Sequence, residues 1–155
     1  MNNSKALLGA GCFWGVEEFF RKMPGILNTK VGYAGGNFNN PSYEEVCSDK
    51  TGHAEVVEIE FDQKIISYEK ILDVFWECHD PTQLNRQGFD YGSQYRSIIL
   101  YYTDEQKCIA EKSKNNFQKK ISKKIVTEIV KEVKFYLAEE YHQCYIKKNH
   151  IKTID

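Results

Sequence analysis

Hydrophobic and polar residues alternate along this chain with periods that predict both strands and helices. The clearest strand covers His53 to Asp62, where Val57, Ile59 and Phe61 share one face and acidic residues share the other. Apolar runs predict further strands at about Lys5 to Gly9, Ile26 to Tyr33, Ser97 to Tyr102 and Thr127 to Val133. These strands are separated by helical patterns, which is typical of mixed α/β proteins.

Apolar residues at helical spacing predict three helices between the strands. The first begins at about Cys12 and is ended by Pro24-Gly25. The second opens at Ser67, and the third runs from the capping box Thr103-x-x-Gln106 to about Lys120. The core stripes of the first two helices are Cys12, Val16, Phe19, Phe20 and Met23, and Tyr68, Ile71, Leu72, Phe75 and Trp76.

The order of these elements is strand, helix, strand, strand, helix, strand. This order matches the split βαβ, or ferredoxin-like, core, with one helix and one strand appended. We therefore predict the α/β fold class, as an α+β two-layer sandwich, with residues 1–155 forming a single domain. Two long polar loops, at about 32–52 and 80–95, can both reach the turn before the first helix, and loops of this length often carry function.

Glu55 breaks the alternation of the clearest strand. It shares the phase of Val57 and Ile59, so its carboxyl group should point toward the core. A carboxylate there must be paired or protonated, because burial raises its pKa. The side chain could instead reach solvent at the strand end or pair with a cation. We favour a functional role, since inward carboxylates are rare without one.

Cys12 lies where the first strand turns into the first helix, in the stretch Gly11-Cys12-Phe13-Trp14-Gly15. Unpaired N–H groups and the positive end of the helix dipole favour a thiolate at such a place. The two aromatic residues that follow can form an apolar wall beside the sulfur. The alternative is a packed, inert thiol, but the context favours a reactive one.

The remaining cysteines and the histidines are scattered. The five cysteines stand singly at positions 12, 47, 78, 108 and 144, so neither a structural zinc site nor a C-x-x-C redox pair is indicated. No histidine is clearly placed as a base, which disfavours a cysteine protease or an acyl transferase. A thiol, a carboxylic acid and the phenols of Tyr43 and Tyr95 on the long loops suit attack on an electrophile that must be protonated.

Composition limits the partners. The formal net charge of −1, from 21 basic and 22 acidic side chains, offers no electrostatic footprint for nucleic acid or for a membrane surface. The N-terminus lacks the apolar core of a signal peptide, and no run approaches membrane-spanning length. Together with unpaired cysteines, this predicts a cytoplasmic protein with reduced thiols, and we expect a monomer.

Five motifs follow one another over nearly the whole chain. They are 11–17, 31–36, 43–47 with 51–55, 79–82 with 85–88 and 94–97, and 138–143. In their residues and order they resemble the A-type peptide methionine sulfoxide reductases, which act on the S epimer of methionine sulfoxide. The resemblance implies an oxidoreductase that repairs oxidised proteins by reducing this group, in proteins or in the free amino acid.

The same resemblance implies roles for individual residues. Cys12 attacks the sulfoxide sulfur and becomes a sulfenic acid, while Glu55 gives a proton to the sulfoxide oxygen. The other implied site residues are Tyr43 and Tyr95 as hydroxyls beside Glu55, Asp90 as an orienting residue, and Phe13 and Trp14 as the wall that holds the substrate methyl group.

The second half of the cycle departs from the family pattern. Many members carry resolving cysteines in a glycine-rich tail, whereas residues 149–155 contain neither cysteine nor glycine. Cys144 is the resolving candidate, with external thioredoxin, glutaredoxin or glutathione as reductant and no bound cofactor. The alternative is a single-cysteine enzyme, reduced directly at Cys12.

Two other classes of function stay open from the residues. His142-x-Cys144 with Cys78-His79 could bind a metal, although the spacing is poor and we predict no metal site. A module that recognises oxidised methionine without reducing it is also possible, but Cys12 and Glu55 argue against it.

Overall fold

The computed structural model describes residues 3–132 and 134–148. Its core elements are β1 (Asn3–Ala10), α1 (Phe13–Arg21), β2 (Ile26–Ala34), β3 (Ala54–Asp62), α3 (Tyr68–Glu77) and β6 (Ser97–Tyr101). β3 pairs antiparallel with β1 and β2, and β1 pairs antiparallel with β6. The resulting order β6-β1-β3-β2 is that of a ferredoxin-like sheet, so the predicted fold class is confirmed.

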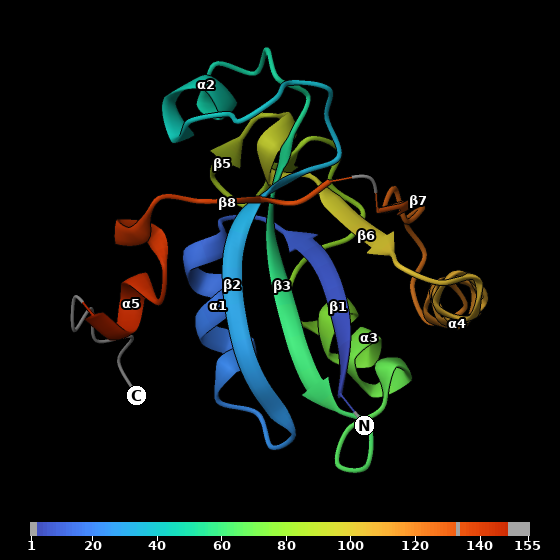
Figure 1. Ribbon diagram of the computed structural model, residues 1–155. Helices are drawn as coiled ribbons and strands as arrows, with labels where there is room; N and C mark the ends of the chain where they lie inside the picture. The colour runs from blue at the N-terminus through green and yellow to red at the C-terminus, as the bar shows by residue number, and fades with distance from the viewer. Residues whose placement is uncertain (1–2, 133, 149–155) are drawn as a thin grey trace.

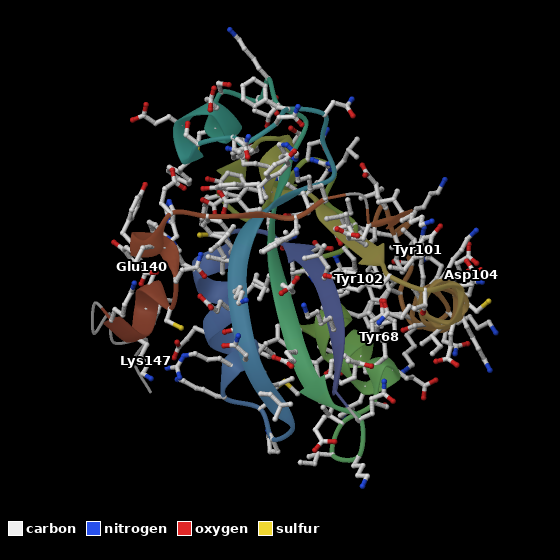
Figure 2. All side chains as sticks on the ribbon, viewed as in Figure 1. Tyr68, Tyr101, Tyr102, Asp104, Glu140 and Lys147 are labelled. Atoms are coloured by element: carbon white, nitrogen blue, oxygen red, sulfur yellow. The ribbon has the colours of Figure 1, made fainter. Side chains whose placement is uncertain are left out.

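The sheet is extended at both edges. After α4 (Asp104–Gln118), β7 (Glu128–Lys131) joins β6 in parallel, and β8 (Tyr136–Leu137) then joins β2 antiparallel at the opposite edge. A short 3₁₀ turn, η2 (Glu140–His142), and α5 (Tyr145–Lys148) follow. Figure 1 shows α4 on one side of the sheet and α5 on the other. In Figure 2, the side chains of Tyr101 and Asp104 mark the first side, and Glu140 and Lys147 mark the second.

The helices form a layer on one face of the sheet. Phe20 of α1, Ile59 of β3 and Phe75 of α3 are fully buried in the larger hydrophobic core between the layers (Figure 1). A smaller cluster on the other face includes Val56 and Ile98, with Phe135 packed against it. The segment that leads into β8 therefore covers part of the second face.

Side-chain caps define where two of the helices begin. Ser67 Oγ accepts from Lys70 N at 3.0 Å at the start of α3, as predicted. Thr103 Oγ1 accepts from Gln106 N at 3.1 Å at the start of α4. The Gln106 amide, however, accepts from Tyr102 N and donates to Lys5 O, both at 2.9 Å or less. The predicted capping box is thus only half formed, because its Gln ties α4 to the sheet instead.

The two long loops contain short elements that the periodic pattern did not predict. They are α2 (Tyr43–Cys47), β4 (Arg86–Gln87), β5 (Asp90–Tyr91) and the 3₁₀ turn η1 (Ser93–Tyr95). A reciprocal capping box between Ser42 and Glu45 begins α2. β4 and β5 form a separate hairpin. In Figure 1, α2 and β5 lie at the end of the sheet where β1 ends and α1 begins.

Three details differ from the sequence predictions. Helical spacing predicts Phe19 on the buried stripe of the first helix, but it is 50% exposed, and Glu17 is buried instead. α4 ends at Gln118 and β7 at Lys131, earlier than predicted. Val133, which closes the last predicted strand, lies outside the described residues. In the described part of the chain, every helix is too short or too polar to cross a membrane.

Candidate active site

Cys12 is the N-cap residue of α1 and lies between β1 and the helix. Gly11, with φ of +102°, makes the turn that leads to it. The backbone N–H groups of Trp14 and Gly15, at the start of the helix, lower the pKa of the thiol, as expected there. Burial, and then the carboxyl groups of Glu55 and Asp90, outweigh them and raise the pKa of the thiol to about 12. The predicted stabilised thiolate is therefore absent at rest, and the sulfur carries its proton.

Glu55 points inward from β3, as its phase predicted, and is 1% exposed. Its Oε1 accepts from Phe13 N at 3.1 Å, while Oε2 is buried and has no hydrogen-bond partner among the described residues. Burial raises the pKa of this carboxyl group to about 8; the Phe13 N–H opposes the shift and Asp90 adds to it. Glu55 is thus an acid that still holds its proton near neutral pH.

The predicted hydroxyls come from the two loops. Tyr43 begins α2, and its hydroxyl shares a hydrogen bond with the Cys47 thiol. Tyr95 ends η1, where burial first and then the charge on Glu55 raise its pKa to about 12. Burial also raises the pKa of Tyr43 well above its ordinary value. Both phenols therefore stay protonated and able to donate a hydrogen bond.

Asp90 lies on β5 and is exposed, unlike the groups it acts on. Its charge raises the pKa values of both Cys12 and Glu55. A carboxylate at this place keeps protons on the thiol and on the buried acid. Because Asp90 is part of β5, the β4–β5 hairpin lies next to Cys12 and Glu55.

Comparison with known proteins identifies the arrangement. A family model described as peptide methionine sulfoxide reductase matches residues 4–155. The chain belongs to this family. Peptide methionine sulfoxide reductase MsrA of Methanothermobacter thermautotrophicus is 54% identical over 147 residues, which cover 94% of this chain and 87% of that protein. Members of the family are oxidoreductases that reduce methionine sulfoxide and so repair oxidised proteins; this chain does the same.

Solved structures of the family agree with the fold. Mxr1 from Saccharomyces cerevisiae in reduced form matches with a TM-score of 0.92 and 39% identity, over 97% of this chain and 87% of that one. Mxr1 in complex with Trx2 matches with a TM-score of 0.67 and 28% identity, over 93% of this chain and 85% of that one.

The two aromatic residues after Cys12 lie in different surroundings. Phe13 is 1% exposed, and its ring packs against Tyr33, with 5.7 Å between ring centroids. Trp14 is half-buried and stacks on Tyr145 at 3.8 Å with only 7° between the ring planes. Of the two residues predicted to hold the substrate methyl group, Trp14 is therefore the more accessible.

His142 was left among the scattered histidines by sequence reasoning, but the structure places it against Trp14. It is fully buried, and its Nδ1 accepts from Trp14 Nε1 at 2.8 Å. Its ring lies 4.5 Å from that of Tyr43 and 5.1 Å from that of Phe13. Burial lowers the pKa of His142, so the neutral ring holds Trp14 in place. Nothing in the local sequence signals a contact with a residue 128 positions earlier.

Glu139 was also missed, and it positions Tyr43. Its Oε2 accepts from Tyr43 N at 2.9 Å, and its Oε1 accepts from Tyr33 Oη at 2.9 Å. Tyr33 is the strand partner of Glu55 in the β2–β3 pair. The C-terminal segment thereby fixes α2 against the strands that carry the acid.

Cys144 packs against α1 rather than against Cys12. Its N–H donates to Glu17 Oε1 at 2.7 Å, and its thiol faces Glu17 Oε2 at 3.7 Å. Cys144 has a φ of +49°, a left-handed conformation that is uncommon for a residue with a side chain. All five cysteines are free thiols in this structure. Cys47 and Cys108 are exposed, and Cys78 is half-buried beside Phe75.

The side chains considered for a metal site are engaged separately. His142 bonds Trp14 and Cys144 faces Glu17, as described above. His79 contacts the Phe75 carbonyl through Nδ1 at 2.6 Å and Ser97 Oγ through Nε2 at 2.7 Å. Within residues 3–132 and 134–148, no three Cys, His, Asp or Glu side chains are grouped so that they could hold a metal ion.

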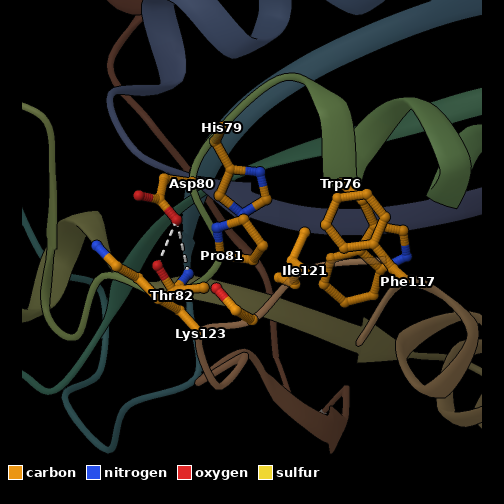
Figure 3. A pocket seen from close by; sticks show the side chains of 9 residues that line it. Trp76, His79, Asp80, Pro81, Thr82, Phe117, Ile121 and Lys123 are labelled. Carbon is orange, nitrogen blue, oxygen red and sulfur yellow. Dashed lines mark hydrogen bonds between the residues drawn. The ribbon is translucent and has the colours of Figure 1, made fainter. Parts of the chain in front are cut away.

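A cavity of about 380 Å³ lies beside the His79–Thr82 segment, away from Cys12 and Glu55. Figure 3 shows Trp76, Phe117 and Ile121 on its apolar side and Asp80 hydrogen-bonded to Thr82 on the other. Burial lowers the pKa of His79, which lines the cavity, to about 4. A neutral histidine with both nitrogens engaged supports the backbone here.

Proposed function

We propose that this site reduces the S epimer of methionine sulfoxide, with Cys12 as nucleophile and Glu55 as acid. One observation carries the assignment. Glu55 presents a buried carboxyl oxygen with no partner among the described residues, on a group with a pKa of about 8. A protonated carboxyl group that is electrostatically coupled to the Cys12 thiol suits an electrophile whose oxygen must be protonated.

The first half-reaction then balances without another reactant. Glu55 gives its proton to the sulfoxide oxygen, and Cys12 Sγ attacks the sulfoxide sulfur. The thiol proton passes to the Glu55 carboxylate. The hydroxyl group then moves to the Cys12 sulfur, as the S–O bond of the sulfoxide and the S–S bond formed by the attack both break. The methionine sulfur gains two electrons and the cysteine loses two, so the products are methionine and a sulfenic acid.

The surrounding residues bind and orient the substrate in this proposal. The hydroxyls of Tyr43 and Tyr95 donate hydrogen bonds to the sulfoxide oxygen. Phe13 and Trp14 enclose the methyl group, and His142 holds the indole of Trp14 in position. Asp90 orients the site and keeps Glu55 protonated through its charge.

Cys144 is our proposed resolving cysteine. It adjoins Tyr145, which stacks on Trp14, two residues from Cys12. Its left-handed backbone is the kind of strain that collects at functional sites. Attack of its thiol on the sulfenic acid forms a Cys12–Cys144 disulfide and releases water. An external dithiol then reduces the disulfide, as the Mxr1 complex with Trx2 suggests for a thioredoxin-type partner.

Peptide mapping after one turnover without reductant tests the resolving step. A Cys12–Cys144 disulfide supports the scheme. A disulfide to Cys47 would assign the step to another thiol, and a lasting sulfenic acid on Cys12 would assign it to the external reductant.

We also propose that residues 1–155 act as one catalytic domain, as a monomer in the cytoplasm and without a bound cofactor.

Turnover of both sulfoxide epimers with dithiothreitol tests the reaction itself. We expect reduction of the S epimer, none of the R epimer above background, and loss of the S-epimer activity in Cys12→Ser. Equal reduction of the two epimers, or activity that survives in Cys12→Ser, contradicts the assignment.

A further inference from the structure

The β4–β5 hairpin displays large apolar side chains to solvent. Phe89, at its turn, is 98% exposed, and Leu84 and Tyr91 are 68% and 66% exposed. Single exposed apolar residues are ordinary on protein surfaces. Three large ones within eight residues are not, and clusters of this kind mark places where other molecules bind.

Contacts within the hairpin hold the backbone of the turn that carries Phe89. Gly88 has a φ of +62°, and its N–H donates to Gln83 Oε1 at 2.8 Å. The guanidinium of Arg86 lies over the ring of its strand partner Tyr91, 4.5 Å from the centroid. An aromatic side chain on a hydrogen-bonded turn can bind with little loss of conformational entropy.

This surface is continuous with the active site. The Gln87 side chain lies against Gly11, where an added Cβ would come within 2.9 Å of Gln87 Cγ. Asp90, the residue after Phe89, acts electrostatically on Cys12 and Glu55. Phe89 directly precedes Asp90, and successive Cα atoms are about 3.8 Å apart, so the Phe89 backbone lies at the edge of the site, which we call its mouth.

The molecule that contacts these exposed apolar residues can be inferred from the substrate of the site, methionine sulfoxide. A methionine sulfoxide that reaches Cys12 from within a protein brings its sequence neighbours across the mouth, at about 3.3 Å per residue. Methionine lies mostly among apolar residues, and its oxidation disrupts their packing. In a core strand or helix, residues on the same buried face recur two to four positions along the chain, so apolar sequence neighbours arrive with the sulfoxide.

We propose that Leu84, Phe89 and Tyr91 form a docking surface for apolar residues that flank methionine sulfoxide in unfolded segments of oxidised proteins. The inference rests on the proposed function of the site. It makes the enzyme selective for an extended apolar chain over the free amino acid.

Two peptides of equal length and charge test the proposal. Each carries a central methionine (S)-sulfoxide, flanked on both sides by Leu and Val in one and by Ser and Gly in the other. The substitutions are Phe89→Ser, Phe89→Leu as the conservative variant, and Ile65→Ser as the control. Ile65 is 61% exposed in the turn after β3, at the opposite end of the sheet from the hairpin (Figure 1). Dithiothreitol serves as reductant, so that no protein partner takes part.

With the apolar peptide, Phe89→Ser should lower kcat/KM about tenfold, mainly through KM. Phe89→Leu should retain most of the rate, and Ile65→Ser all of it. With the polar peptide or N-acetylmethionine (S)-sulfoxide, Phe89→Ser should change kcat/KM less than about twofold. An equal loss with every substrate, or no loss with the apolar peptide, overturns the proposal.

Three further measurements distinguish a surface for the substrate from one that binds the reductant or a second copy of the chain. Loss of rate only when thioredoxin replaces dithiothreitol assigns the surface to the reductant and overturns the proposal. A lower sedimentation coefficient in Phe89→Ser than in the unmodified protein assigns the surface to a second copy of the chain and also overturns the proposal. Fluorescence anisotropy of both labelled peptides with Cys12→Ser measures docking without turnover. Tighter binding of the apolar peptide, lost on adding Phe89→Ser, supports the surface even if the proposed reaction fails.

Discussion

Two buried glutamates, Glu55 and Glu17, are each 1% exposed, yet their surroundings give them opposite uses. Glu17 accepts from Thr29 Oγ1 at 2.8 Å and from Cys144 N at 2.7 Å, and it faces the Cys144 thiol. Glu55 has one backbone N–H on one oxygen and no partner among the described residues for the other. Burial alone therefore does not determine the use of a glutamate; the number of hydrogen-bond partners of its carboxyl group matters as well. A buried carboxyl group whose two oxygens are both paired joins segments together, whereas one left half-paired keeps its proton available.

The largest effect should come from Glu55→Gln. The amide keeps an oxygen to accept from Phe13 N–H, but it cannot donate a proton as a carboxylic acid does. We expect kcat for sulfoxide reduction to fall by about 10²–10⁴-fold, while substrate binding is retained. Single-turnover release of methionine measures the rate, and titration with sulfoxide peptide measures binding. A full rate in this variant would remove Glu55 from the acid role.

The pH dependence should follow the same group. Since reduction needs protonated Glu55, kcat/KM should fall as pH rises through about 8. Stability should fall too. The pKa of Glu55 is about 8 when folded and 4.5 for an ordinary glutamate, so the unfolded chain loses this proton first as pH rises. The stabilising contribution is complete below pH 4.5 and is lost toward pH 8, at up to about 1.4 kcal/mol per pH unit.

Urea unfolding at about pH 5, 7 and 9 checks this slope, with Glu55→Gln as the matched control. The difference between the two proteins should shift from pH 5 to about pH 8 and change little beyond it. Parallel stability curves would mean that Glu55 ionises in the folded protein as it does in the unfolded chain.

The smallest effect should come from Glu17→Gln, the counterpart at the fully paired position. The amide replaces one acceptor oxygen by a donor, so one buried hydrogen bond is lost. We expect the free energy of unfolding to fall by about 1–2 kcal/mol. Single-turnover release of methionine should change less than about threefold. If the rate collapses as in Glu55→Gln, the distinction between the two glutamates is wrong.

Sequence reasoning predicted the elements whose patterns repeat. The alternation in β3 placed Glu55 inward, and the apolar stripe of α3 was correct residue by residue. The order of strands and helices was enough for the ferredoxin-like core, because local periodicity and short connections define that topology.

Elements without repeats were missed. Strands of two residues, such as β8, are too short to show a period, and α2 has only five residues. The Ser42-x-x-Glu45 capping box is a usable signal for α2 that periodicity alone does not detect. The burial of Glu17 could also have been anticipated, because it lies four residues after Phe13 and three before Phe20 on one helical face. His142 and Glu139 lie in the motif 138–143, but periodicity gave their contacts no signal, since their partners are distant in sequence.

The hydrogen bond between Trp14 and His142 can form only late in synthesis of the chain, because the two residues are far apart in sequence. Cys12, the proposed nucleophile, and Trp14 leave the ribosome well before His142, which is made 128 residues after Trp14. At ordinary rates of synthesis, of about 5–20 residues per second, that interval lasts about 6 to 26 s. During this interval the nascent chain holds Cys12 beside a Trp14 side chain that still lacks its partner His142.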